Sequence, residues 1–114
     1  MPGIFGLITK KRRAWAEQQL ARMGKSLLHE SFYVTGTWFD ESMGVYVGWV
    51  ARENSFADGM PIRNEKNNVV LLFSGEDYPE PGTARHLKER GHGCEETGPS
   101  YLVHLYEENP NNFF

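Results

Sequence analysis

The chain begins with Met-Pro-Gly-Ile-Phe-Gly-Leu, residues 1–7, a segment that is unusually apolar for a terminus. Ile4, Phe5 and Leu7 predict a buried strand, and the two glycines beside them indicate that other backbone or a ligand comes close. Because a small residue follows the initiator Met, we expect the Met to be removed, which makes Pro2 the first residue. The secondary amine of Pro2 would then be the amino terminus, directly before the predicted strand.

The composition predicts one globular domain and excludes several classes of protein. The chain has 114 residues, 39% of them hydrophobic and 24% charged, which is enough for a single modest core. A net charge of -3 argues against a nucleic-acid or anionic-membrane partner, and the basic run at residues 10–13 is interpreted as a solvated connection. No apolar run approaches the roughly 20 residues of a membrane span. Cys94 is the only cysteine, so a reducing, cytoplasmic location is expected.

Hydrophobic periodicity and turn residues predict the remaining elements. An amphipathic helix is expected first, followed by a two-stranded hairpin, a polar loop, a strand with both faces covered, and two shorter helices. In order, these are residues 14–28, 31–38 with 43–50, 51–68, 69–73, 83–90 and 100–108.

The same pattern predicts which side chains face inward. Gly24 weakens the last turn of the first helix, so this helix is expected to end early. Gly44 and Gly48 leave room on one face of strand 43–50 for an opposing layer. The predicted inward residues are Ala16, Leu20, Met23 and Leu27 in the first helix and Leu102 and Leu105 in the last.

Several segments occur in an order that is typical of one family. Residues 1–6 correspond to a family opening of Met-Cys-Gly-Ile-Phe/Ala-Gly, and residues 60–65 to Gln-Pro-Met-x-Asn-Glu. Residues 70–78, Val-Leu-Leu-Phe-Ser-Gly-Glu-Asp-Tyr, correspond to a strand that ends in Asn-Gly-Glu-Ile-Tyr-Asn. Arg-Gly-His at 90–92 and His-Leu-Tyr-Glu-Glu at 104–108 follow in the family order. The chain thus resembles the amino-terminal glutaminase domain of asparagine synthetase and related class II glutamine amidotransferases.

The resemblance implies a fold and a set of partners. The implied fold is α+β of the Ntn-hydrolase type, an αββα sandwich of two antiparallel sheets. Residues 1–114 would be the amino-terminal part of a glutamine amidotransferase type 2-like domain, so we expect an incomplete domain and no second domain. The implied partner is a downstream ATP-dependent synthetase domain that binds ATP and Mg, with no cofactor in this chain. A homodimer is left open.

Two catalytic positions of the family are altered here. The family uses an amino-terminal cysteine to attack the glutamine amide. Pro2 occupies that position and has no nucleophilic side chain, so we expect glutaminase activity to be absent. The family oxyanion hole uses an asparagine and the following glycine, whereas Ser74 precedes Gly75 here. Loss of one such donor costs about 2.7–4 kcal/mol in comparable sites.

The resemblance also implies a vestigial glutamine pocket. Glu76 matches the family glutamate that contacts the substrate amine. The arginine that binds the substrate carboxylate falls on Trp49, and Arg52 replaces it only if the loop is realigned. The expected aspartate falls on Gly98 or a neighbour. These departures predict a catalytically degenerate domain that serves as a structural or regulatory scaffold in an asparagine synthetase-like, amide-forming protein.

Two alternatives stay open from the residues alone. An amino-terminal proline before a strand and a helix also resembles the tautomerase superfamily, in which Pro2 would act as a general base. A module that binds a ligand or a partner without catalysis is the other alternative. The four histidines show no His-x-x-x-His pairing, and His92 with Cys94 is too little for zinc, so no metal site is expected.

Overall fold

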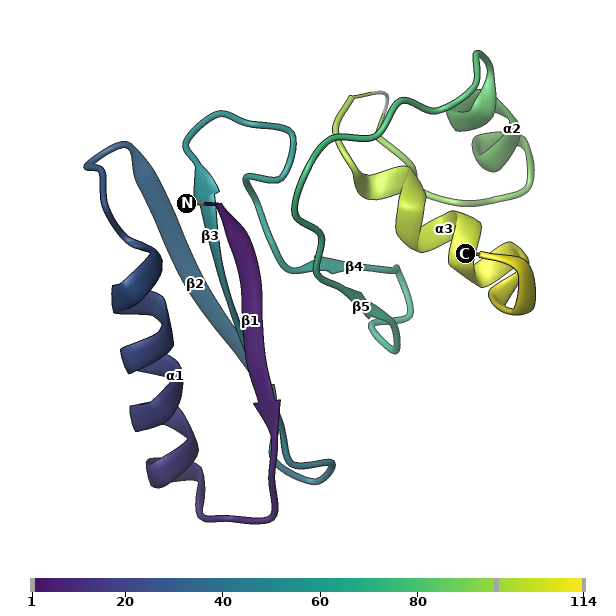
Figure 1. Cartoon of the computed structure of the whole chain (residues 1–114). Coiled ribbons are helices and arrows are strands. Elements are labelled where there is room, and N and C mark those ends of the chain that lie inside the picture. Colours follow the sequence, from purple (N-terminus) through teal and green to yellow (C-terminus); the bar gives the residue numbers. More distant parts are fainter. Residues whose placement is uncertain (1, 96, 114) are drawn as a thin grey trace.

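The amino-terminal segment forms a strand, β1 (Gly3–Ile8), that packs in a three-stranded antiparallel sheet. The computed structural model describes residues 2–95 and 97–113, so the predicted removal of Met1 lies outside the described residues. Within them the fold is α+β, with two antiparallel sheets and three α-helices (Figure 1). The further elements are α1 (Arg13–Leu27), β2 (Tyr33–Asp40), β3 (Val45–Arg52), β4 (Ile62–Arg63), β5 (Val70–Leu71), α2 (Thr83–Glu89), α3 (Ser100–Glu108) and the 3-10 helix η1 (Pro110–Asn112).

The first sheet has the order β1-β3-β2, with α1 packed along one face (Figure 1). Its core joins Ala16 and Leu20 of α1 to Tyr46 of β3. The expectation that β1 is a buried strand is wrong, since its residues alternate between half-buried and exposed, and Ile4 is 43% exposed. The reason is that α1 covers only one face of the sheet, and side chains alternate between the two faces of a strand.

Phe5 fixes the distance between α1 and the sheet. Phe5 pairs with Gly48 of β3, and a Cβ added at Gly48 would lie 2.5 Å from the Phe5 ring. Across the ring, a Cβ at Gly24 of α1 would lie 3.2 Å from Phe5 Cζ. The ring therefore lies between two glycines. The predicted room at Gly48 is confirmed, but Gly24 does not end the helix, which continues to Leu27.

The inner face of α1 differs from the predicted one at a single position. Ala16, Leu20 and Gly24 are buried, whereas Met23 is 37% exposed, so its predicted inward place is wrong. Because Gly24 faces Phe5, the buried face of α1 consists of every fourth residue, namely Ala16, Leu20 and Gly24. Met23 lies next to this face rather than on it.

The second half of the chain surrounds a separate small core. This core contains Leu87, Cys94, Tyr101 and Leu102, from α2, α3 and the loop between them. The prediction that Leu105 of α3 faces inward is wrong, because it is 36% exposed while Tyr101 to His104 are buried. None of the described helices is long and apolar enough to cross a membrane.

The predicted strand at residues 69–73 is much shorter in the structure. Only β5 pairs there, with the two residues of β4, and residues 69–73 are all partly exposed, so the prediction that both faces are covered is wrong. Pro61, directly before β4, has no N–H to extend the pairing. The apolar residues 69–73 favour a strand, but the length of β5 is limited by its partner β4, which has only two residues.

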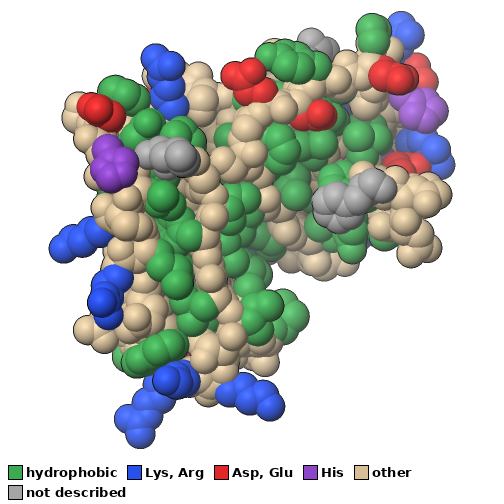
Figure 2. All heavy atoms as spheres, viewed as in Figure 1, with side chains coloured by type: hydrophobic (Ala, Val, Ile, Leu, Met, Phe, Trp, Pro, Cys, Tyr) green, Lys and Arg blue, Asp and Glu red, His purple; other side chains and the backbone are tan. Residues whose placement is uncertain are grey.

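Charged side chains are unevenly distributed over the surface. Figure 2 shows Lys and Arg side chains at the end where β1 is connected to α1, whereas the opposite end carries Asp and Glu side chains together with further Lys and Arg side chains. Residues 10–13 are all exposed. They line a cavity of about 600 Å³ together with residues 41–44, but Lys11 lies over the Trp15 ring and Arg13 pairs with Glu17.

Candidate functional site

A small cavity lies where the amino terminus meets the segment after β5. We call it the Pro2 cavity. Its volume is about 210 Å³, below the roughly 300–1,000 Å³ of typical ligand pockets. Its lining residues are Pro2, Ala51, Arg52, Ser55, Ala57, Ser74, Gly75 and Glu76.

Strand register explains how these residues meet. Gly3 pairs with Val50, so Pro2 lies beside the end of β3, where Arg52 is the last residue. Residues 74–76 follow β5 and reach the cavity from the second sheet. Gly75 has a φ of +124°, a conformation that residues with a side chain rarely adopt. The turn that carries Ser74 and Glu76 past Pro2 therefore depends on this glycine.

Arg52 and Glu76 bring opposite charges to the Pro2 cavity. Glu76 Oε2 accepts a hydrogen bond of 2.8 Å from the Tyr78 hydroxyl, and this bond raises the pKa of Tyr78. The Arg52 guanidinium lies 5.6 Å from the centroid of the Phe32 ring. Each charged side chain thus already has a neighbour that restricts its position.

Two residues named from the sequence do not line this cavity. Trp49 is buried, and its ring lies against Gly36 of β2, where it leaves no room for a Cβ. Gly98 lies in the turn before α3 with a φ of +81°. Of the two candidate positions for a carboxylate-binding group, Arg52 rather than Trp49 is at the cavity.

The chemistry available at the Pro2 cavity is limited. Acyl transfer needs a nucleophile with an adjacent base. The side chain of Pro2 is a saturated ring, and the hydroxyls of Ser55 and Ser74 have no histidine beside them among the described lining residues. Among the described lining residues, no side chain provides a nucleophile with an adjacent base.

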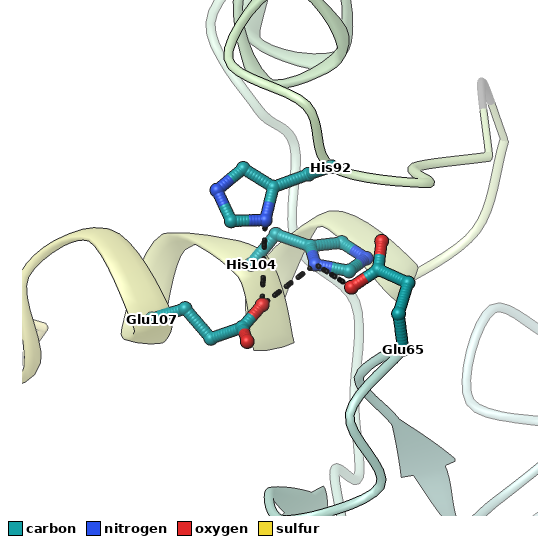
Figure 3. Close-up of side chains that lie close together, drawn as sticks. All are labelled: Glu65, His92, His104 and Glu107. Atoms are coloured by element: carbon teal, nitrogen blue, oxygen red, sulfur yellow. Dashed lines mark hydrogen bonds and ion pairs between the residues drawn. The ribbon is translucent and has the colours of Figure 1, made fainter.

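A second group of side chains gathers beside α3, and we call it the His/Glu cluster. Glu65 follows β4, His92 follows α2, and His104 and Glu107 are three residues apart on one face of α3. One nitrogen or oxygen atom of each lies within 4.8 Å of the corresponding atoms of the other three. Figure 3 shows the four side chains pointing toward one another from these separate segments.

The shortest distances in the cluster centre on one carboxylate oxygen and one imidazole nitrogen. Glu107 Oε2 is 3.0 Å from His104 Nδ1 and 3.4 Å from His92 Nδ1. His104 Nδ1 is also 3.7 Å from Glu65 Oε2. The His104 side chain is only 3% exposed, while that of Glu65 is 47% exposed, so the cluster opens to solvent on the Glu65 side.

Asn64 holds Glu107 in place from the opposite side. Its Nδ2 donates a 2.6 Å hydrogen bond to Glu107 Oε1. Its Oδ1 accepts hydrogen bonds from the backbone N–H groups of Asn68 and Val69, both at 3.0 Å. Asn64 is buried, so it is a rigid donor that connects the β4–β5 turn to α3.

His92 and Glu65 are held in the same manner. His92 Nε2 lies 2.6 Å from Glu108 Oε1, and Arg90 pairs with Glu108 Oε2 at 2.9 Å. The backbone N–H of Gly93 donates to Glu65 Oε1. His92 thus uses Nε2 for Glu108, and its Nδ1 faces the cluster. Glu65 likewise uses Oε1 for the Gly93 N–H, and its Oε2 faces the cluster.

The environment favours the ionised form of both cluster carboxylates. The Gly93 hydrogen bond lowers the pKa of Glu65. Burial raises the pKa of Glu107, but hydrogen bonds from Asn64 and His104 and the two nearby imidazoles outweigh it, so its pKa is lowered. Both carboxylates are negatively charged at neutral pH.

No metal site was expected from the sequence, and the four residues of the His/Glu cluster were not recognised as a group there. The spacing of His104 and Glu107 on a helix was visible in the sequence and predicts a shared face. The addition of Glu65 and His92 depends on how the β4–β5 turn and the loop after α2 pack on α3, which no local pattern indicates.

Comparisons of the whole chain with known proteins do not place it in a family. No protein-family model, no curated protein and no solved structure matches it.

Proposed function

We propose that the chain is a catalytically degenerate glutaminase-like domain of an asparagine synthetase-like protein. The observation that carries the proposal is that five of the seven residues named from the resemblance, Pro2, Arg52, Ser74, Gly75 and Glu76, line one cavity. These residues come from three separate segments of the chain. The Ntn-hydrolase type of αββα sandwich is part of the same proposal.

The loss of catalysis follows from the chemistry of the cavity. A thiolate at the amino terminus is replaced by the ring of Pro2, and an amide donor by the shorter Ser74 hydroxyl. A cavity that retains Glu76 and Arg52 but lacks a nucleophile has no route to a covalent glutamyl intermediate.

The proposed role is to pack against and help shape an ATP-dependent, amide-forming domain. ATP and Mg would bind in that domain, and its nitrogen source would be free ammonia. Homodimerisation is compatible with this role but is not required by it.

The test compares nitrogen sources in the full-length protein that contains this chain. Ammonia with ATP should support amide formation, whereas glutamine should not replace ammonia and should release none above the rate without protein. A matched control is glutamine with an active class II amidotransferase in the same buffer. Glutamine-dependent ammonia release by this protein would refute the proposal.

One observation favours a second candidate function. Pro2 is exposed and lines a cavity beside Arg52, as a tautomerase with a proline base would require. Phenylpyruvate tautomerisation tests it, with Pro2→Ala as the variant and Pro79→Ala, at an exposed loop proline, as the control. Activity that is lost only in Pro2→Ala would establish the tautomerase and exclude the degenerate domain.

The opposite charges of Arg52 and Glu76 favour a zwitterionic ligand if the domain binds one. Free α-amino acids should then raise the thermal unfolding midpoint, because a ligand that binds only the folded state stabilises it. Arg52→Gln should abolish the shift, and Arg22→Gln, on the exposed face of α1, should not. A shift that persists in Arg52→Gln would place the ligand elsewhere.

A further inference from the structure

The His/Glu cluster presents the donor atoms that zinc and its neighbouring divalent ions prefer. It offers two imidazole nitrogens, from His92 and His104, and carboxylate oxygens from Glu65 and Glu107. Zn²⁺ is bound by imidazole nitrogen and carboxylate oxygen at about 2.0–2.2 Å, with four ligands in a tetrahedron. Mg²⁺ and Ca²⁺ instead select all-oxygen sites, so two histidines argue against them.

The distances between the donor atoms fit a tetrahedral ion. Metal–ligand distances of about 2.1 Å place neighbouring ligand atoms about 3.4 Å apart. The three shortest distances, around Glu107 Oε2 and His104 Nδ1, are 3.0, 3.4 and 3.7 Å. The other pairs lie within 4.8 Å, so closure around an ion requires side-chain movements on the order of 1 Å.

Three of the four side chains also have the outer hydrogen bonds that orient metal ligands. A ligating histidine usually donates its second ring N–H to a carboxylate, which fixes its tautomer. Glu108 is in position to accept that proton from His92 Nε2, which leaves Nδ1 free of a proton and facing the cluster. Asn64 and the Gly93 N–H hold the outer oxygens of Glu107 and Glu65.

The negative charge of the His/Glu cluster favours the binding of a cation. The pKa values of both carboxylates are lowered, so both are ionised at neutral pH. The adjacent Glu108 is paired with Arg90, so that pair contributes little net charge. Two negative charges within a few ångströms of one another, one of them largely buried, repel unless a cation or bound protons neutralise them.

We propose that Glu65, His92, His104 and Glu107 form a binding site for a divalent transition-metal ion of the Zn²⁺ class. All four ligands come from the protein, which is typical of a structural site. The ion would tie the β4–β5 turn and the loop after α2 to α3, and it would enter from the exposed Glu65 side. None of the four residues lines the Pro2 cavity, so the site is independent of the proposed function.

The competing explanation is an ion-pair network without metal, in which one or both histidines are protonated. Both arrangements use the same contacts, but they differ in their response to added metal. A protonated network has a lower affinity for Zn²⁺, because the ion must displace the protons.

The experiment measures Zn²⁺ binding to the full chain after dialysis against a chelator. Calorimetric titration at neutral pH should give one ion per chain, and the thermal unfolding midpoint should rise with Zn²⁺ concentration. Mg²⁺ at the same concentrations should have no effect. Co²⁺ should give the intense visible absorption of a tetrahedral site.

Glu65→Gln is the decisive variant, because Glu65 is exposed and a glutamine oxygen still accepts from the Gly93 N–H. It should fold as the unaltered chain does and weaken Zn²⁺ binding at least tenfold. Glu108→Gln, which alters the partner of His92 and also removes the ion pair with Arg90, should weaken it about 10- to 100-fold. His29→Asn and Glu53→Gln, at exposed positions outside the cluster, serve as controls and should leave the affinity unchanged.

Two outcomes overturn the proposal. One is the absence of saturable Zn²⁺ binding to the metal-free chain, which would show that the cluster is an ion-pair network without metal. The other is an affinity that Glu65→Gln does not change, or that His29→Asn weakens equally, which would show surface histidines to be the binding groups.

Discussion

Replacement of Gly48 by alanine should destabilise the protein because there is no room for a methyl group beneath Phe5. The new Cβ would lie 2.5 Å from two ring carbons, whereas carbon atoms in contact are about 3.5–4.0 Å apart. The ring would have to move about 1 Å, and Gly24 of α1 blocks it from the other side. Overpacking of this kind costs about 1–3 kcal/mol.

The matched variant is Gly24→Ala, on the opposite side of the same ring. Its Cβ would be 3.2 Å from Phe5 Cζ, a tight contact that a small shift relieves. Alanine also gains about 1 kcal/mol of helix propensity over glycine. We therefore expect Gly24→Ala to be close to neutral, although it is chemically the same change.

Urea and thermal unfolding measure both effects. With roughly 4 °C per kcal/mol for a chain of this size, Gly48→Ala should lower the unfolding midpoint by about 4–12 °C. In a Phe5→Ala background the effect of Gly48→Ala should largely disappear, because the steric partner is absent. If Gly48→Ala is neutral, or if its effect persists without Phe5, the placement of β1 beneath α1 is wrong.

Other predictions follow from the cores and from buried polar groups. Gly36→Ala should destabilise the sheet and alter tryptophan fluorescence, because the Trp49 ring occupies the space of the new Cβ. Asn64→Ala should cost about 1–3 kcal/mol in chemical denaturation, since it leaves two partly buried backbone N–H groups and the Glu107 carboxylate without their partner. The pKa of Glu107 is lowered in the folded chain, so its stabilisation is present above its usual pKa of about 4.3 and is lost as the pH falls through and below that value. Glu107→Gln should therefore lose less stability between pH 7 and pH 4 than the unaltered chain does. Cys94 is buried, so a thiol reagent should modify it only as fast as the chain unfolds, and rapid labelling of the folded chain would contradict its position.

The Pro2 cavity shows how far motifs in the sequence could identify residues that lie together in the structure. Pro2, Ser74, Gly75 and Glu76 were named from motifs, and the structure brings them together at one cavity. For the arginine position, counting along the chain pointed to Trp49. Strand register instead brings Arg52 to the Pro2 cavity, because Trp49 belongs to the buried part of β3.

The amino-acid sequence by itself determined most of the elements of this protein, but not β4, η1 or the length of β5. Apolar and β-branched runs, helical periodicity and turn residues predicted β1, α1, the β2–β3 hairpin and the positions of α2 and α3, because these signals arise within a few consecutive residues. The room at Gly48 could also be predicted, since a glycine within a strand indicates a close approach.

Only the tertiary structure decided which side chains meet. The Phe5 ring selects Gly24 rather than Met23 for the inner face of α1, and a two-residue partner limits β5 to two residues. The His/Glu cluster depends on the packing of three distant segments. Contacts between distant segments depend on the packed positions of whole elements, and local sequence patterns carry no information about those positions.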